Sequence, residues 1–480
     1  MLSTCLNLLL GILIPLAAGY VSIALICRDN RLTFPLQLAL AYGVGFGLVA
    51  FWMFALYSLH QPFHLNIIRI PLLLYTLIGL IPLFKRKRPA LAPTPNGISN
   101  SLHTNPSFRT PMVIHALFVG ALLLYIAQNM YFVFWRSLNV PLSSFDAIAT
   151  VAFKAKVFFY EPAPPSLGLL PHRTYPLFVP FIESWISFNL GYWDDILIKI
   201  IFPLALLSFT VIFYNFLAVF TRRMWALMGC AVLLSSNLFI YHATISYSDF
   251  FLMYFNCVAI MLLALWNQNK NSGLLLLAAI FAGLVTFVKL EGTAFLLIYA
   301  ALFLLINLPS TAFSLSGKRL NSIKFFVPSV GSAAAFHLYK VMNNILKEGG
   351  GTMDKTDFDL SLAKITFIPQ ILFKFAKNLL MSGNWSIVWV ILALSLCWAK
   401  GRRLAEESKI ILLGLLMFFG LYFGIALMTT NYVWIAGESE VTTLSRLFLH
   451  FYPLAVLLIV LINYSLWSDG LKNTSSLNPK

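Results

Sequence analysis

Charged side chains are scarce in this sequence. Asp, Glu, Lys and Arg make up 10% of its 480 residues, and hydrophobic residues make up 60%. A typical soluble domain has roughly a quarter of its residues charged. The composition excludes an ordinary soluble protein and predicts an all-α polytopic membrane protein.

Cysteine is also scarce and carries no pattern. The five cysteines lie inside or at the edges of apolar runs, and no CxxC pair occurs. This spacing excludes a disulfide framework and a cysteine-based metal signature.

Long apolar runs dominate the rest of the chain. A bilayer core of about 30 Å needs about 20 apolar residues per helix, and by this measure the sequence predicts about thirteen transmembrane helices. They are expected at residues 5–27, 34–57, 66–84, 113–135, 196–219, 224–244, 249–266, 273–288, 293–308, 325–345, 385–399, 410–430 and 447–465. Residues 364–380 mix apolar side chains with Lys374 and Lys377, which predicts a helix lying in the membrane interface.

The net charge of +16 is read as a topology signal and not as a nucleic-acid footprint. With alternating loops, most Lys and Arg and few acidic residues fall on one side, as cytoplasmic loops require. The basic run 85–88 follows the third span on that side. We therefore expect the N-terminus outside and the C-terminus in the cytoplasm.

Three regions follow from the pattern. Residues 89–112 are rich in Pro, Ser and Asn, which is typical of a flexible linker. The predicted regions are a three-helix extension with its linker (1–112), a membrane core (113–345), and an outer loop with an interfacial helix and the last transmembrane helices (346–480).

The first outer loop, residues 136–195, is large and polar although apolar runs flank it, and we expect it to contain helices that lie in the membrane interface. Ionisable groups inside a membrane are costly, so their placement is informative. The predicted topology puts them at outer helix ends or in outer loops, whereas a transporter tends to place its site at the midplane. The sequence thus predicts a site open to the outer leaflet, with candidate residues Asp146, Lys154, Lys156, His172, Arg173, Tyr175, Asp249, Lys289, Glu291, Arg446 and His450.

Asp146 has two interpretations. A carboxylate there can serve as a general base, or it can cap the helix that follows. If residues 146–160 are helical, Lys154 and Lys156 point about 80° to either side of Asp146 and cannot pair with it. The two lysines then meet an anion or extend toward lipid head groups.

The other candidates also keep alternatives. Asp249 can cap its own helix. Arg173 suits phosphate geometry or anchors the loop at the interface. Lys289 and Glu291 are close enough in sequence to pair with each other, whereas Arg446 has no acid within the following turn, which favours a ligand role.

Four motifs resemble those of the GT-C membrane glycosyltransferases in their order along the chain and in their predicted side of the membrane. This superfamily includes protein O-mannosyltransferases and the lipid A aminoarabinose transferase. The similarity covers about residues 113–300, with Arg446 as a less specific addition. The motifs are Asp146 with Lys154-Ala155-Lys156, Tyr175-Pro176-Leu177, Tyr247-Ser248-Asp249, and Thr286-Phe287-Val288-Lys289-Leu290-Glu291-Gly292.

The resemblance implies a GT-C-like core that transfers a sugar from a polyprenyl-phosphate donor to a glycan, lipid or protein acceptor by a single inverting displacement. Asp146, as the base, and Asp249 are the candidate catalytic residues. Lys289, Arg446, and His172 or Arg173 are expected to hold the phosphate. The chain lacks a second carboxylate two residues from Asp249, so no metal or other cofactor is expected.

The implied location is the outer face of a bacterial inner membrane. Two alternatives remain: a flippase or transporter for lipid-linked sugars, and a ligase or polymerase of lipid-linked glycans. The early position of the Asp146 loop favours the transferase.

Overall fold

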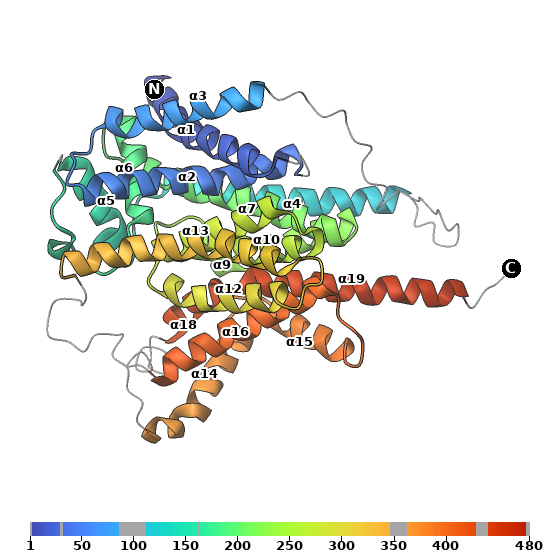
Figure 1. Cartoon of the computed structure of the whole chain (residues 1–480). Helices are drawn as coiled ribbons and strands as arrows, with labels where there is room; N and C mark the ends of the chain where they lie inside the picture. Colours follow the sequence, from blue (N-terminus) through green and yellow to red (C-terminus); the bar gives the residue numbers. More distant parts are fainter. Residues whose placement is uncertain are drawn as a thin grey trace.

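The computed structural model describes residues 2–28, 32–85, 112–161, 163–345, 362–428 and 440–476. Within these ranges all regular elements are helices, so the predicted all-α class is confirmed (Figure 1). The α-helices are α1 (Leu2–Ile26), α2 (Phe34–Ser58), α3 (Leu65–Phe84), α4 (Met112–Asn139), α5 (Ala152–Tyr160), α6 (Phe178–Leu190), α7 (Ile201–Phe220), α8 (Arg223–Leu233), α9 (Asn237–His242), α10 (Ser248–Asn269), α11 (Ser272–Val288), α12 (Glu291–Asn307), α13 (Leu315–Met342), α14 (Ile368–Met381), α15 (Val388–Trp398), α16 (Glu406–Met428), α18 (Glu440–Leu449) and α19 (Tyr452–Ser476).

Eight of the described helices are long and apolar enough to cross a membrane, which identifies a membrane-embedded protein. They comprise α1, α2, α3, α4, α7 with the short 3-10 turn before it, α10, α16 and α19. Shorter apolar helices are α8, α11, α12 and α15. Each predicted span coincides with at least one helix, but the total of thirteen membrane crossings stays a prediction.

The predicted single span 224–244 is wrong as one helix. α8 ends at Leu233, and α9 begins at Asn237, so residues 234–236 separate the two helices. The Ser236 side chain accepts a hydrogen bond from the Phe239 amide at 3.2 Å and so caps α9. A serine in this position satisfies a backbone donor that a continuous helix would use itself, and this favours the break.

The first outer loop folds into several short elements. A π-helical turn (Ala147–Val151) leads into α5, and a 3-10 turn (Leu167–Leu169) precedes α6. α6 is almost entirely buried and packs against α1, α2 and α5. It ends at Gly191, whose φ of 82° is a left-handed conformation that terminates helices. Part of the predicted interfacial loop is therefore a buried helix, because its apolar side chains find partners within the protein.

The N-terminal helices are packed into the same bundle as the rest of the chain. α1 and α2 lie in close contact: a Cβ at Gly45 would lie 1.9 Å from the Pro15 carbonyl oxygen, and one at Gly19 would lie 2.0 Å from that of Ala41. Small residues permit this backbone approach between membrane helices. α2 also packs against α6 and α7 (Figure 1). Most of the predicted linker, residues 89–111, lies outside the described residues.

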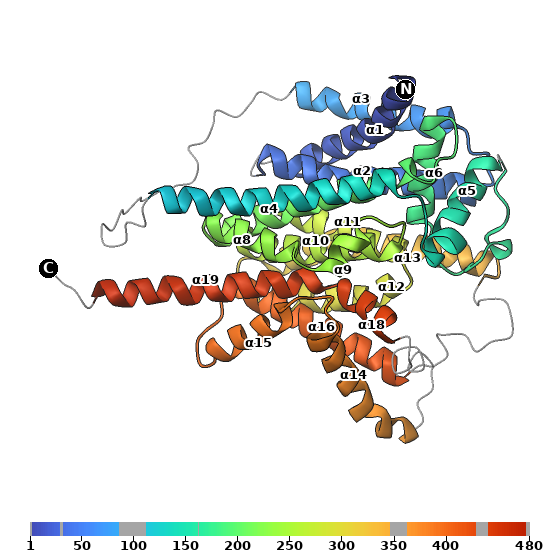
Figure 2. The same ribbon diagram turned by 180° about the vertical axis from the view of Figure 1, so that it is seen from behind.

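The helix predicted within residues 364–380 is present as α14, preceded by a 3-10 turn (Leu362–Phe367), and its position in the membrane interface stays a prediction. It leaves the bundle at an angle, while α5, α6 and α18 gather at the end remote from the C-terminal end of α19 (Figures 1 and 2). The outer segment 346–361 lies outside the described residues. The fold thus brings a helix near the C-terminus to the same end as the first outer loop.

Candidate functional site

Asp249 lies at the centre of a buried ionic network. It occupies the first turn of α10, directly after a short turn from α9, and its side chain is 1% exposed. Its Oδ1 accepts hydrogen bonds of 2.9 Å from Lys289 Nζ and 2.9 Å from His450 Nε2. Its Oδ2 accepts from Arg446, at 2.9 Å from Nη2 and 3.2 Å from Nε. The carboxylate is held as an anion by donors from two other parts of the chain, the turn before α12 and the end of α18.

Arg446 joins Asp249 to the first outer loop. Its remaining terminal nitrogen, Nη1, donates to Asp146 Oδ2 at 2.6 Å, and its guanidinium lies 4.7 Å from the centre of the Tyr247 ring. The planar fork of arginine suits two carboxylates and an aromatic face at once. The side chains of Arg446 and Asp146 are 27% and 38% exposed, so this end of the network reaches the surface.

Lys289 connects the buried end to the start of α12. It lies between α11 and α12 in extended backbone, and its Nζ is 3.2 Å from Glu291 Oε1. The expected pairing of Lys289 with Glu291 is confirmed. The second partner, Asp249, could not be read from local spacing.

His450, between α18 and α19, is fully buried and links Asp249 to α16. Its Nδ1 is hydrogen-bonded to the Tyr422 hydroxyl, while Asn256 Nδ2 donates to its backbone oxygen at 2.6 Å. Burial lowers the pKa of the His450 imidazole, despite the opposing influence of Asp249. A neutral ring then donates from Nε2 to Asp249 and accepts from Tyr422 at Nδ1.

The network is close to balanced in charge. It holds three carboxylates, Asp146, Asp249 and Glu291, and two permanent cations, Lys289 and Arg446. Burial alone disfavours both cations, but the adjacent carboxylates raise the pKa of Lys289 and of Arg446 above their usual values. Both cations are therefore charged and already neutralised.

The lysines predicted beside Asp146 have other roles in the structure. Lys154 is 1% exposed, and its Nζ donates to the His172 carbonyl oxygen at 2.8 Å. Lys156 is exposed and lies 5.9 Å from the centre of the Trp193 ring. The Lys154 side chain is turned inward and helps tie the loop together, so it does not extend toward lipid head groups; an anion-binding role for either lysine stays a prediction.

The 172–175 turn lies beside the network. His172 has a φ of 47°, a left-handed conformation in which non-glycine residues are uncommon, and its ring lies 5.1 Å from that of Tyr175. The Tyr175 phenol is near enough to Lys289 to affect it electrostatically. Ligand roles for His172, Arg173 and Tyr175 stay predictions.

Sequence reasoning missed Tyr247 and Tyr422 as members of the site. Tyr247 was within a quoted motif, but only the fold shows that its ring underlies Arg446. Tyr422 sits in an apolar run with no local signal for a partner on α18 or α19. Within the described part of the chain, no three His, Cys, Asp or Glu side chains are arranged to hold a metal ion.

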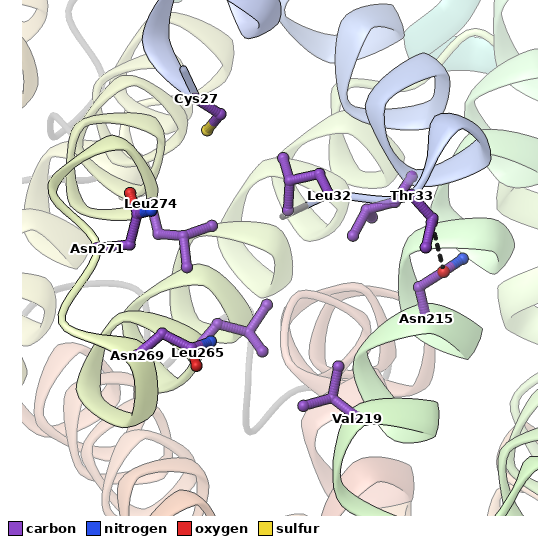
Figure 3. Close-up of a pocket in the computed structure, with 10 residues that line it drawn as sticks. Cys27, Leu32, Thr33, Asn215, Val219, Leu265, Asn269, Asn271 and Leu274 are labelled. Atoms are coloured by element: carbon purple, nitrogen blue, oxygen red, sulfur yellow. Dashed lines mark hydrogen bonds between the residues drawn. The ribbon is translucent and has the colours of Figure 1, made fainter. Parts of the chain in front are cut away.

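A further cavity lies elsewhere in the fold. It has a volume of about 110 Å³ and is formed where α1, α2, α7, α10 and α11 meet (Figure 3). Its polar lining is uncharged, and Thr33 Oγ1 donates to Asn215 Oδ1 at 3.1 Å. None of the predicted site residues lines it.

No family model matches the chain, and neither does any curated protein or solved structure. Fold and composition define a helical membrane protein. Any statement of its activity rests on the chemistry of the site itself.

Proposed function

We propose that the protein is a GT-C-like glycosyltransferase that moves a sugar from a polyprenyl-phosphate donor to an acceptor on the outer face of the membrane. One observation carries this proposal. The half-exposed Asp146 carboxylate is fixed by Arg446 at 2.6 Å through Oδ2, while Oδ1 accepts no hydrogen bond from a described residue. A positioned, accessible carboxylate oxygen is what a general base requires.

Asp146 Oδ1 takes the proton of an acceptor hydroxyl as its oxygen attacks C1 of the donor sugar. The bond between C1 and the phosphate oxygen breaks, and the lipid phosphate leaves with the bonding electron pair. The acceptor enters opposite the leaving group, so the configuration at C1 inverts. The acceptor is a glycan, a lipid or a protein hydroxyl.

Asp249 acts as a positioning residue in this proposal. Its carboxylate is 1% exposed and both of its oxygens are occupied, so it has no oxygen left for a substrate proton. It fixes Arg446, and Arg446 fixes Asp146. Lys289, Glu291 and His450 hold Asp249 in turn.

The location proposed is a bacterial inner membrane, with the network on the periplasmic side and the N-terminus on the same side. The gathering of α5, α6 and α18 at one end of the bundle supports a shared site for the first outer loop and Arg446 (Figure 2).

The test is sugar transfer by the purified full chain in proteoliposomes, with a panel of radiolabelled polyprenyl-phosphate sugars and an envelope extract as acceptor. We expect Asp146→Asn to lower transfer by about 10²- to 10⁴-fold, the usual contribution of general base catalysis. Asp469→Asn, near the far end of α19, is the matched control and should transfer normally. Equal transfer by Asp146→Asn and the unchanged protein would remove the base role. Lipid binding without transfer by either would favour the flippase alternative.

A further inference from the structure

The two cations expected to hold the donor phosphate are already neutralised. Arg446 binds Asp146 and Asp249, and Lys289 binds Asp249 and Glu291. An anionic ligand there would have to compete with buried carboxylates. Other cations near Asp146 are better suited to an anion.

Arg136 and Lys199 are two such cations. Arg136, in the last turn of α4, donates from Nε to Thr244 Oγ1 at 3.2 Å, and its guanidinium lies 5.4 Å from the centre of the Tyr241 ring. Lys199 is 2% exposed, and its Nζ donates to the Val140 carbonyl oxygen. Both side chains line one small cavity.

The cavity between them carries excess positive charge. No described carboxylate forms a salt bridge with Arg136 or Lys199, and their two charges repel each other. Asp195 also acts on Lys199 but is exposed to solvent. The buried Glu183 accepts a 2.5 Å hydrogen bond from Ser246. Burial raises the pKa of the Glu183 carboxyl to about 8, which keeps most of it neutral at pH 7.

The remaining lining carries hydroxyl groups, of which that of Thr244 already donates to the Tyr241 carbonyl oxygen and that of Ser246 to Glu183. Ser143, Ser144, Thr244 and Ser246 all face the cavity, whose volume of about 10 Å³ is close to that needed for one water molecule. Its outer wall belongs to the 140–147 loop, in which Ser143 is exposed. A phosphate group is larger than this cavity, so its binding requires the 140–147 loop to move outward.

The cavity lies close to the carboxylate network, because two of its lining residues are direct sequence neighbours of residues in that network. Ala147 lines it and directly follows Asp146, and Ser246 lines it and directly precedes Tyr247. A group held by Arg136 and Lys199 would thus lie next to the turns that carry Asp146 and Asp249, on the side opposite the carboxylate network.

We propose that Arg136 and Lys199, with the serine and threonine hydroxyls around them, bind a phosphate group. In the context of the proposed function, on which the identity of the ligand rests, this group is the phosphate of the polyprenyl donor or product. Lys289 and Arg446 then keep the carboxylates in place and do not hold phosphate. Arginine and lysine are the usual phosphate-binding side chains, and hydroxyls complete such sites.

The experiment measures equilibrium binding of two ³²P-labelled probes, a polyprenyl monophosphate and orthophosphate, to the full chain in a phosphate-free maltoside detergent. We expect Arg136→Gln and Lys199→Gln each to weaken binding at least tenfold, and Arg136→Lys to weaken it less. Arg223→Gln, at the exposed start of α8, removes the same charge and should change nothing. Size-exclusion chromatography checks folding, and the half-buried Arg136 decides the result if the Lys199 variant does not fold.

Binding of both probes would show a site for phosphate in general. Binding of the lipid alone would identify the lipid as the source of the phosphate. Either result supports the site if Arg136→Gln weakens that binding. Unchanged binding by Arg136→Gln, or an equal loss in Arg223→Gln, overturns the proposal. Asp146→Asn in the same assay separates the two claims. Phosphate binding that depends on Arg136, in a protein that transfers no sugar, sustains the phosphate site and removes the transferase.

Discussion

Arg446 Nη1 donates a 2.6 Å hydrogen bond to Asp146 Oδ2, a residue 300 positions earlier in the chain. The first outer loop and the last part of the membrane bundle therefore share one charged contact. The same guanidinium binds the buried Asp249 at 2.9 Å. One arginine sets the distance between an accessible carboxylate and a buried one.

Replacing Arg446 by Lys should abolish most of this arrangement. An ammonium is a single point charge and cannot reproduce the fork that reaches both carboxylates. If Asp146 is the base, we expect sugar transfer to fall at least 100-fold, comparable to the effect of a misplaced catalytic group. Arg223→Lys is the control. Transfer within twofold of the unchanged protein would show that the bridge is dispensable.

Asp249→Asn should destabilise the fold more than Asp146→Asn does. Removing one partner of a buried ion pair leaves uncompensated charge and costs about 3–5 kcal/mol, and Asp249 has three cationic or imidazole partners. Asp146 is 38% exposed, so water can replace its contact. The thermal midpoint in detergent measures both variants. Equal midpoints would mean that Asp249 contributes no more than a surface residue.

Glu183→Gln should make stability less dependent on pH. Because burial raises the folded pKa of the Glu183 carboxyl to about 8 from 4.5, the unfolded chain loses its proton first as the pH rises. The contribution of Glu183 to the free energy of unfolding is fully present below about pH 4.5. It decreases by about 1.4 kcal/mol per pH unit as the pH rises to about 8. The thermal midpoint of Glu183→Gln should therefore exceed that of the unchanged protein most at pH 8.

The control for Glu183 is Glu406→Gln at the start of α16, whose side chain is 63% exposed. It should leave the pH dependence of the midpoint unaltered. A Glu183→Gln protein with the same slope between pH 5 and pH 8 would contradict a neutral buried Glu183.

Gly45→Ala should disrupt the contact between α1 and α2. The added Cβ would lie 1.9 Å from the Pro15 carbonyl oxygen, so the helices must separate. We expect a loss of about 1–3 kcal/mol, the usual range for overpacking. Gly120→Ala is matched to it, since nothing lies within 4 Å of that position on α4. A lowered thermal midpoint for Gly120→Ala alone would reverse the interpretation.

Local sequence determined much of the architecture. Apolar run length and the polar breaks between runs located most of the described helices, including α14 with its two lysines. Asp194, in the polar break before α7, caps the following turn, because its Oδ1 accepts from the amides of Ile196 and Leu197 at 2.8 and 2.9 Å. The pairing of Lys289 with Glu291 was also visible, since both lie on one turn.

Tertiary structure alone decided which charges meet. Asp249 lies about 200 positions before Arg446 and His450, so no helical or strand period relates it to them. It also decided that Lys154 turns inward and that α6 is buried, because both depend on neighbours contributed by other segments. Hydrophobicity fixes where a chain enters the membrane, but the partner of each buried charge is set by how the helices pack, since a desolvated charge is stable only where opposite charges and donors converge.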